Sequence, residues 1–339
     1  MDNLILFDKS TLKALLIERA GETKFGEHVQ LLTNVCNIYE QLKNLDVEFV
    51  IFGIPEDVGV IANHGKPGAL NTWEATIKIL LNTQSNLYSF ADKTLILGEI
   101  DCQEELSKLK GLDQNKKGFF KKVRKQVSKI DKKVSFVVHE IVKAGKIPII
   151  IGGGQNNAYG NLKGTALAKN SAINAVNLDA HTDFRAEEGR HSGNGFTYAF
   201  KEGFLKNYFI LGLHEDYSPD KVLQSINKIK AIQYNTFEAI KIRKEIKFKN
   251  ALQEALEHVS NTCFGIELDC DAIQAIPSSA QTPSGFNVNN AREFITYFGK
   301  HSNASYLHIC EAAPNQDQAL QVGKMIAYFI SDFMRAKMN

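Results

Sequence analysis

Eight short apolar runs constrain the fold of this chain more than any other feature of its sequence. Most are rich in Val, Ile, Leu or Phe without strict alternation, which is typical of strands buried on both faces. The runs are 47–54, 94–100, 147–151, 174–179, 207–213, 229–234, 262–269 and 305–311. Amphipathic helical patterns lie between many of them, including 28–44, 72–82, 117–143, 250–259, 290–299 and 317–336. This alternation predicts an α/β fold in which helices sandwich a mainly parallel sheet.

The composition indicates one globular domain. With 339 residues, 44% hydrophobic and 23% charged, the chain is long enough for one large α/β domain. No Pro- or Ser-rich linker and no internal repeat divides it. We therefore expect a single domain over 1–339, with 1–45 as an N-terminal helical extension.

Charge and hydropathy argue against two classes of partner. A net charge of +2 gives no strong steering toward nucleic acid. No apolar stretch approaches the roughly 18–20 residues that span a bilayer, and the N-terminus does not resemble a signal peptide. The five cysteines lack CxxC spacing, so we expect all five to pack in the core of a cytoplasmic protein.

Residues 117–133 form a lysine-rich stretch with apolar residues at helical spacing. It could bind an anionic partner. The spacing favours a simpler interpretation, a helix with one buried stripe and a solvated lysine face. The sequence assigns this helix no role.

The segment 177–183, Asn-Leu-Asp-Ala-His-Thr-Asp, carries the first chemical signal. In an extended chain Asp179, His181 and Asp183 would share one face, roughly 7 Å apart. The alternative is a polar turn in which Asp183 caps the next helix. Clustered buried charge is unfavourable unless something binds it.

Three other apolar runs also end in polar groups. They end in Asp269-Cys270-Asp271, in Gly152-Gly153-Gly154-Gln155 and in Glu311. Ligands of open α/β sheets bind at the carboxyl ends of the strands. The four ends can therefore meet at one site.

Asp179, His181, Asp183, Asp269 and Asp271 together supply four carboxylates and one imidazole. Such a set suits Mn²⁺ or Mg²⁺ better than tetrahedral zinc. Four carboxylates exceed what one divalent ion needs, which suggests two ions roughly 3.5–4 Å apart that activate a water for hydrolytic attack.

These motifs resemble those of the ureohydrolase superfamily, which comprises arginase, agmatinase and formimidoylglutamase. Asp179-Ala-His-x-Asp183, Asp269-x-Asp271 and Glu311-Ala-Ala-Pro314 match its motifs in order, and the resemblance covers about 45–335. Ser192-Gly193-Asn194 resembles a substrate loop of the family. The resemblance implies a three-layer α/β/α sandwich with a roughly eight-stranded sheet.

The resemblance also implies roles. Asp179 and Asp269 would bridge two Mn²⁺ ions, Asp183 would ligate the first, and His181 and Asp271 the second. Glu311 would pair with the cationic nitrogen of the substrate, so that Glu311 and Asp183 are the expected catalytic residues.

Two departures from the family pattern matter. Gln155 stands where the family has a histidine ligand, so it is a weak ligand or none, and the first metal site should be weak or empty. Gly195-Phe196 stands where arginases have His-Gly, which disfavours arginase itself.

Arg185, two positions after Asp183, resembles formimidoylglutamases. An arginine at the mouth of the site offers a bidentate fork to a substrate carboxylate, and it would repel agmatine; alternatively, it is a surface residue that balances the acidic site. His191, Ser192 and Asn194 could also contact the substrate.

The sequence thus predicts a hydrolase that converts N-formimidoyl-L-glutamate and water to L-glutamate and formamide, a step of histidine degradation. The alternatives are a guanidine hydrolase of agmatinase or arginase type, and a metal-poor, catalytically silent homologue with a binding role. The expected cofactor is Mn²⁺, up to two ions. The expected partner is a small-molecule amidine, and a homo-oligomer is possible within the family.

Overall fold

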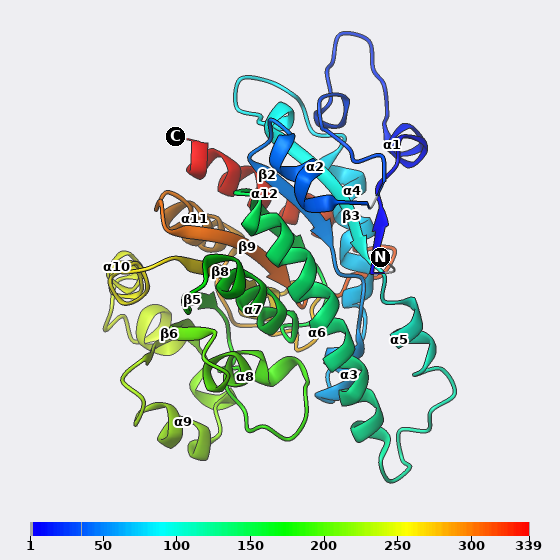
Figure 1. Cartoon of the computed structure of the whole chain (residues 1–339). Helices are drawn as coiled ribbons and strands as arrows, with labels where there is room; N and C mark the ends of the chain where they lie inside the picture. The colour runs from blue at the N-terminus through cyan, green and yellow to red at the C-terminus, as the bar shows by residue number, and fades with distance from the viewer. Residues whose placement is uncertain (1–2, 35, 339) are drawn as a thin grey trace.

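Nine strands form one sheet in the computed structural model, which describes residues 3–34 and 36–338 (Figure 1). Their spatial order is β1-β3-β2-β4-β9-β8-β5-β6-β7. Every neighbouring pair is parallel except β1 with β3. The strands are β1 (Leu4–Leu6), β2 (Phe49–Gly53), β3 (Thr94–Ile100), β4 (Ile147–Ile151), β5 (Ile173–Leu178), β6 (Leu205–Leu213), β7 (Ile232–Thr236), β8 (Phe264–Asp269) and β9 (Ala304–Cys310).

The eight predicted apolar runs correspond to β2–β9, so the prediction of a mainly parallel sheet is confirmed. The ninth strand, β1, lies within the segment that we expected to be helical. It pairs antiparallel with β3 where Gly98 adopts a φ of 128°. A Cβ at Gly98 would lie 2.0 Å from the carbonyl oxygen of Ile5, so only glycine allows this approach.

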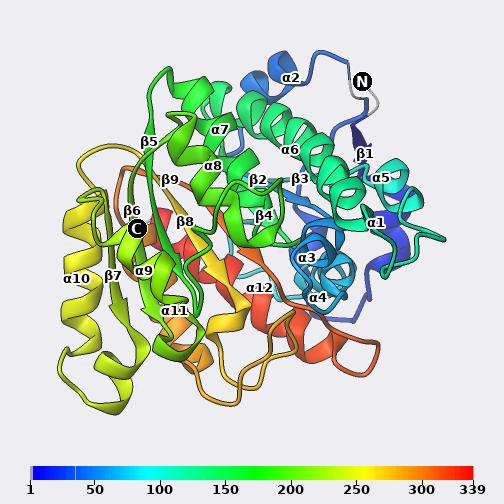
Figure 2. The ribbon, with the colours of Figure 1, turned by 90° about the horizontal axis from the view of Figure 1, so that it is seen from below.

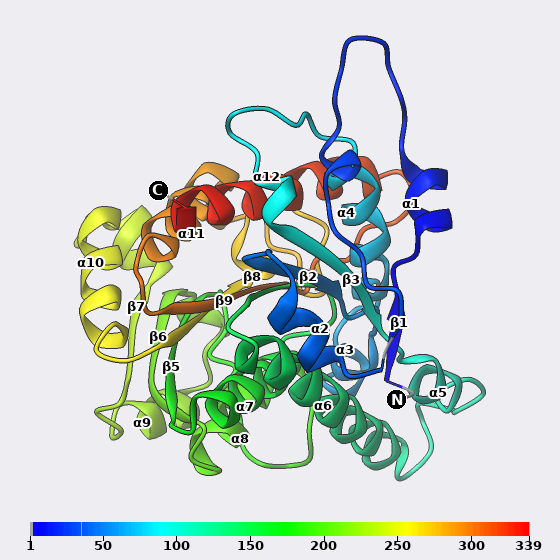
Figure 3. The same cartoon turned by 45° about the horizontal axis from the view of Figure 1, so that its top comes forward.

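Helices cover both faces of the sheet and complete a three-layer α/β/α arrangement (Figure 3). One face packs against α4 (Thr72–Leu80), α10 (Phe248–Val259), α11 (Val288–Gly299) and α12 (Ala319–Met338). The other packs against α2 (Ile38–Asn44), α6 (Phe119–Lys143), α7 (Asn157–Lys169) and α8 (Gly195–Lys201). Alternate side chains of β2 enter the two cores, Ile51 one and Phe52 the other. The remaining α-helices of the described residues are α1 (Lys9–Leu15), α3 (Val58–Ala62), α5 (Gln103–Ser107) and α9 (Asp220–Ile226).

The predicted helices are found where one helix face is apolar. One helix was predicted too long, and one buried helix was missed. The helix expected over 28–44 is restricted to 38–44, because Asn37 adopts a left-handed φ of 50°. Helix α7 was not predicted, because it is buried on nearly all sides and has no clear apolar stripe.

Helices α6 and α7 lie side by side in close contact (Figure 2). A Cβ at Gly160 of α7 would lie 2.7 Å from a methyl carbon of Val134, and one at Gly164 would lie 2.6 Å from the carbonyl oxygen of Ser135. The two glycines therefore set the separation of the helices.

The lysine-rich part of α6 has the predicted buried stripe, which comprises Phe119, Val123, Val127, Ile130 and Val134. Most of its lysines face solvent. Of the cysteines, Cys102, Cys270 and Cys310 are buried. Cys36 is exposed, so the expectation of five core cysteines is wrong there. Among the described residues, we find no helix with the length and apolarity needed to cross a bilayer.

Candidate metal centre and substrate cleft

The four polar strand ends meet because β4, β9, β8 and β5 are consecutive neighbours in the sheet. Their carboxyl ends carry Gln155, Glu311, Asp269 and Asp179 respectively. The sheet therefore brings together groups that lie far apart in the sequence, as expected for an open parallel sheet.

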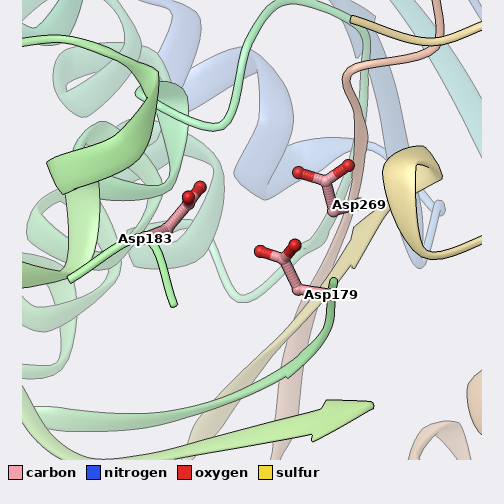
Figure 4. A group of neighbouring side chains, drawn as sticks. All are labelled: Asp179, Asp183 and Asp269. Carbon is pink, nitrogen blue, oxygen red and sulfur yellow. The ribbon is translucent and has the colours of Figure 1, made fainter. Parts of the chain in front are cut away.

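Three aspartates form the densest group of metal-type donors at this edge (Figure 4). Asp179, Asp183 and Asp269 each offer a carboxylate oxygen, and these three atoms all lie within 4.8 Å of one another. All three residues are buried. The spacing is short enough for the three side chains to hold one cation.

The geometry of 179–183 differs from the extended strand used to predict it. Strand β5 ends at Leu178, and Asp183 adopts a left-handed φ of 44°. Asp179 Oδ1 accepts a hydrogen bond from the His181 amide at 2.7 Å, and Asp269 Oδ1 accepts one from the Asp271 amide at 2.7 Å. Each motif is thus a turn closed by its own first aspartate, and the turn brings the donors together.

His181 and Asp271 lie beside the three-aspartate cluster. His181 Nδ1 is 3.5 Å from Asp179 Oδ1 and 3.9 Å from Asp271 Oδ2. The Asp271 carboxylate accepts hydrogen bonds from Ser279 Oγ at 3.1 Å and from the Ala280 amide at 2.9 Å. All five predicted donors therefore lie at one edge of the sheet.

The charges of this site are mutually unfavourable. Burial, followed by the charge of Asp179, raises the pKa of Asp183 well above its usual range. Burial, followed by Asp271 and Asp179, does the same to the pKa of Asp269. Burial lowers the pKa of His181, but Asp179, Asp271 and Asp183 outweigh it and raise that pKa to about 10. A site that favours positive charge this strongly fits a divalent cation.

Glu311 supplies a further carboxylate to the same cleft. It adopts a left-handed φ of 60°, and its Oε1 accepts a hydrogen bond from the Gln155 amide N–H at 2.7 Å. Its Oε2 is buried and has no hydrogen-bond partner among the described residues. Burial, with a contribution from Asp271, raises the pKa of Glu311 to about 8. An unpartnered buried carboxylate oxygen is costly unless a ligand pairs with it.

These groups open into a cleft of about 490 Å³. The predicted site residues that line it are His181, Asp183, Arg185, Ser192, Asp269, Asp271 and Glu311. The Arg185 side chain is half exposed and donates to Asn63 Oδ1 at 3.2 Å. Its guanidinium also lies 3.6 Å from Glu188. Arg185 thus lines the cleft, and its two terminal nitrogens face Asn63 and Glu188.

His191 and Asn194 are not brought to the cleft. Both are fully buried. His191 Nδ1 accepts from the Gly193 amide at 3.2 Å, and Asn194 Oδ1 accepts from Arg190 at 2.6 Å and from the His191 amide at 3.0 Å. Their hydrogen bonds shape the loop that presents Ser192, which is a structural role rather than a contact with substrate.

Gln155 is buried at the predicted position, but its side chain amide is engaged elsewhere. Its Nε2 donates to Glu267 Oε2 at 3.0 Å, and its Oε1 accepts from Cys310 Sγ at 2.8 Å. Of the two possibilities predicted for Gln155, a weak metal ligand or no ligand, this geometry favours no ligand.

Two residues that support the site were not predicted. Glu56 is buried, and its Oε1 accepts hydrogen bonds from the Gly154 amide at 3.1 Å and from Asn157 Nδ2 at 2.8 Å, which fixes the glycine turn. Arg190 pairs with Asp131 through two contacts at 2.9 and 3.2 Å. The sequence patterns described above single out neither Glu56 nor Arg190.

A mainly parallel sheet thus gathers aspartates, a histidine and a glutamate at the carboxyl ends of its strands. The chain belongs to the Arginase family, whose model matches residues 47–335. It is 26% identical over 297 residues to the formimidoylglutamase of Streptococcus pyogenes serotype M3. The aligned region covers 83% of this chain and 82% of that protein. This protein is therefore an arginase-family hydrolase.

Solved structures with the same fold include two relatives of that kind. Trypanosoma cruzi formiminoglutamase with Mn²⁺ is 19% identical, with a TM-score of 0.70 over 88% of this chain and 97% of that chain. Formimidoylglutamase from Bacillus subtilis is 16% identical, with a TM-score of 0.70 over 95% of this chain and 94% of that chain. At these identities the likeness establishes the arginase-like α/β fold.

Proposed function

We propose that this protein is a manganese-dependent hydrolase that converts N-formimidoyl-L-glutamate and water to L-glutamate and formamide in the cytoplasm, as a step of histidine degradation. The observation that carries the proposal is one cleft lined by both acidic and basic groups. Asp183 and Asp269 of the three-aspartate cluster line it, and so does the half-exposed Arg185. The acidic groups would take the cationic amidine of the substrate, and Arg185 would take a carboxylate.

The donor set fits Mn²⁺. Asp179, Asp183 and Asp269 would hold the first ion, and Asp179, Asp269, His181 and Asp271 would hold the second. When bound, the ions would lower the pKa of a water molecule so that it can attack carbon at neutral pH.

The chain's own residues would orient the substrate. Glu311, whose Oε2 has no partner among the described residues, would accept a hydrogen bond from the formimidoyl nitrogen. Arg185 would hold a carboxylate through charged hydrogen bonds. The oxygen of water would then add to the formimidoyl carbon, and the bond from that carbon to the glutamate nitrogen would break as the C=O of formamide forms. Both protons of the water would pass to the departing glutamate nitrogen.

An agmatinase is the weaker alternative within the family, because agmatine has no carboxylate for Arg185 and carries a charge that Arg185 repels. A second candidate is a metal-poor homologue that binds a ligand without turnover. The engaged Gln155 amide favours it, since the first metal position then lacks a family ligand.

One assay separates these functions. Protein stripped of metal and reloaded with Mn²⁺ is incubated with formimidoyl-glutamate, arginine and agmatine, and glutamate, formamide and urea are measured. We expect glutamate and formamide in equal amounts, only in the Mn²⁺-loaded sample. Preference for agmatine would establish the alternative enzyme. Fewer than two ions per chain after Mn²⁺ loading, with no turnover of any of the three compounds, would establish the silent homologue.

A further inference from the structure

The Gln155 side chain is held by a network that lies outside the cleft. Its Nε2 donates to Glu267 at 3.0 Å, and its Oε1 accepts from the Cys310 thiol at 2.8 Å. Gln155, Glu267 and Cys310 are fully buried. Both ends of the amide are therefore paired within the protein.

The network extends through Glu267 to two more side chains. Glu267 Oε1 accepts from the Tyr306 hydroxyl at 2.7 Å, and Oε2 lies 2.5 Å from His308 Nδ1. Because the Glu267 carboxylate can only accept, turning the Gln155 amide would place an oxygen against it. That rotation would also remove a donor from a buried carboxylate, which is unfavourable. The network thus prevents Gln155 from turning its carbonyl oxygen toward a metal.

The two metal positions consequently differ in donor chemistry. The aspartate cluster that would hold the first ion offers oxygen atoms only. The second position has the His181 imidazole beside Asp271. Carboxylate and water suit Mg²⁺ and Mn²⁺ alike, whereas an imidazole favours transition ions over Mg²⁺.

Building on the proposed function, we propose that this chain works with a mixed pair of ions. The first position exchanges freely between Mn²⁺ and Mg²⁺ and fills with Mg²⁺ when it is in excess. The second position retains Mn²⁺. The Glu267 network is the device that makes the pair unequal.

The test uses metal content and electron paramagnetic resonance of the full chain, without substrate. Metal-free protein is loaded with Mn²⁺ and then equilibrated with about a hundredfold excess of Mg²⁺. We expect the spin-coupled signal of two neighbouring Mn²⁺ ions to be replaced by that of an isolated Mn²⁺, with one Mn²⁺ and one Mg²⁺ per chain. Retention of both Mn²⁺ ions, or parallel loss of both, would overturn the inference.

Two matched variants test each position. Gln155→His gives the first position an imidazole, and we expect it to retain two Mn²⁺ ions against Mg²⁺. His181→Asn replaces the nitrogen donor of the second position by an oxygen, and we expect it to lose both Mn²⁺ ions to Mg²⁺. Unchanged exchange in both variants would contradict the assigned donors.

A third variant removes the side-chain amide of Gln155. Gln155→Met keeps the length of the side chain but removes both the carbonyl oxygen and the Nε2 donor to Glu267, which keeps Tyr306 and His308 as partners, and we expect unchanged Mn²⁺ affinity at the first position. A tenfold or larger loss, roughly 1.4 kcal/mol, would show that the oxygen is a ligand. If wild-type protein binds no divalent ion, the proposed function itself fails; if it binds two ions with equal preference, only the mixed pair fails.

Discussion

Two buried polar clusters lie at the same edge of the sheet and differ in one respect, whether their charges have partners. In the cleft, Asp179, Asp183 and Asp269 face one another, and the Oε2 of Glu311 has no donor among the described residues. In the neighbouring network, the single carboxylate of Glu267 accepts from three side chains.

The difference separates a site built for a ligand from one built for support. Buried charge that stays unpaired destabilises a fold, so it persists where a bound group supplies the missing partner. A satisfied network needs nothing more and makes its members rigid. Four predictions test this comparison.

The largest effect is expected for Glu267→Ala. It leaves Gln155, Tyr306 and His308 without their shared acceptor, and removing one partner of a buried pair costs about 3–5 kcal/mol of unfolding free energy. Chemical denaturation measures the loss, with the exposed Glu257→Ala as control. Equal stability of the variant and the wild type would contradict a supporting role for the network.

Asp269→Asn should weaken metal binding without destabilising the metal-free protein. We expect Mn²⁺ affinity to fall by more than about a hundredfold, since even indirect supports of a metal site are worth ten- to a hundredfold. The metal-free protein should be no less stable than wild type, because a buried repelled charge is gone while Asn can still accept from the Asp271 amide. Metal analysis measures the Mn²⁺ affinity, and thermal denaturation measures the stability of the metal-free protein. A strongly destabilised metal-free variant would place Asp269 with the supporting network.

Arg185→Ala tests the proposed contact between Arg185 and a substrate carboxylate. Loss of a charged hydrogen bond costs about 1.5–3 kcal/mol, so KM for formimidoyl-glutamate should rise roughly ten- to a hundredfold. The value of kcat should change much less. The control is Arg190→Lys, which changes a buried arginine outside the cleft lining and should act on stability instead. An unchanged KM in the Arg185 variant refutes the carboxylate role.

The smallest effect is expected for His191, which accepts a hydrogen bond from the Gly193 amide and can take up a proton. Burial, with the charges of Arg124 and Arg185, lowers its pKa from 6.5 to about 4. The unfolded state therefore binds the proton more readily, so the stabilisation is complete above pH 6.5 and is lost as the pH falls toward 4. His191→Asn should flatten the fall in Tm across this window. Parallel Tm curves for the two proteins would show that His191 does not control it.

Much of the fold and of the acidic site could be predicted, because both depend on local patterns. Buried parallel strands appear in the sequence as apolar runs. Because the carboxyl ends of parallel strands share one edge of the sheet, Asp179 and Asp269 were expected to lie there together. The partners of Gln155 could not be predicted, because they come from β8 and β9 and depend on the register of the folded sheet. The contact of Asn194 with Arg190 joins residues only four positions apart, but it lies in a loop that no periodic pattern describes.

Helix α7 begins two residues after Gln155 and is held against α6 at Gly160 and Gly164. This contact has a consequence for the protein's evolution. The exposed lysines of α6 can change with little effect on the fold, whereas any side chain at either glycine would push the two helices apart and displace the turn that precedes α7. A library of random substitutions should therefore be depleted at these two positions well before it is depleted along the lysines, although hydropathy marks neither glycine as important.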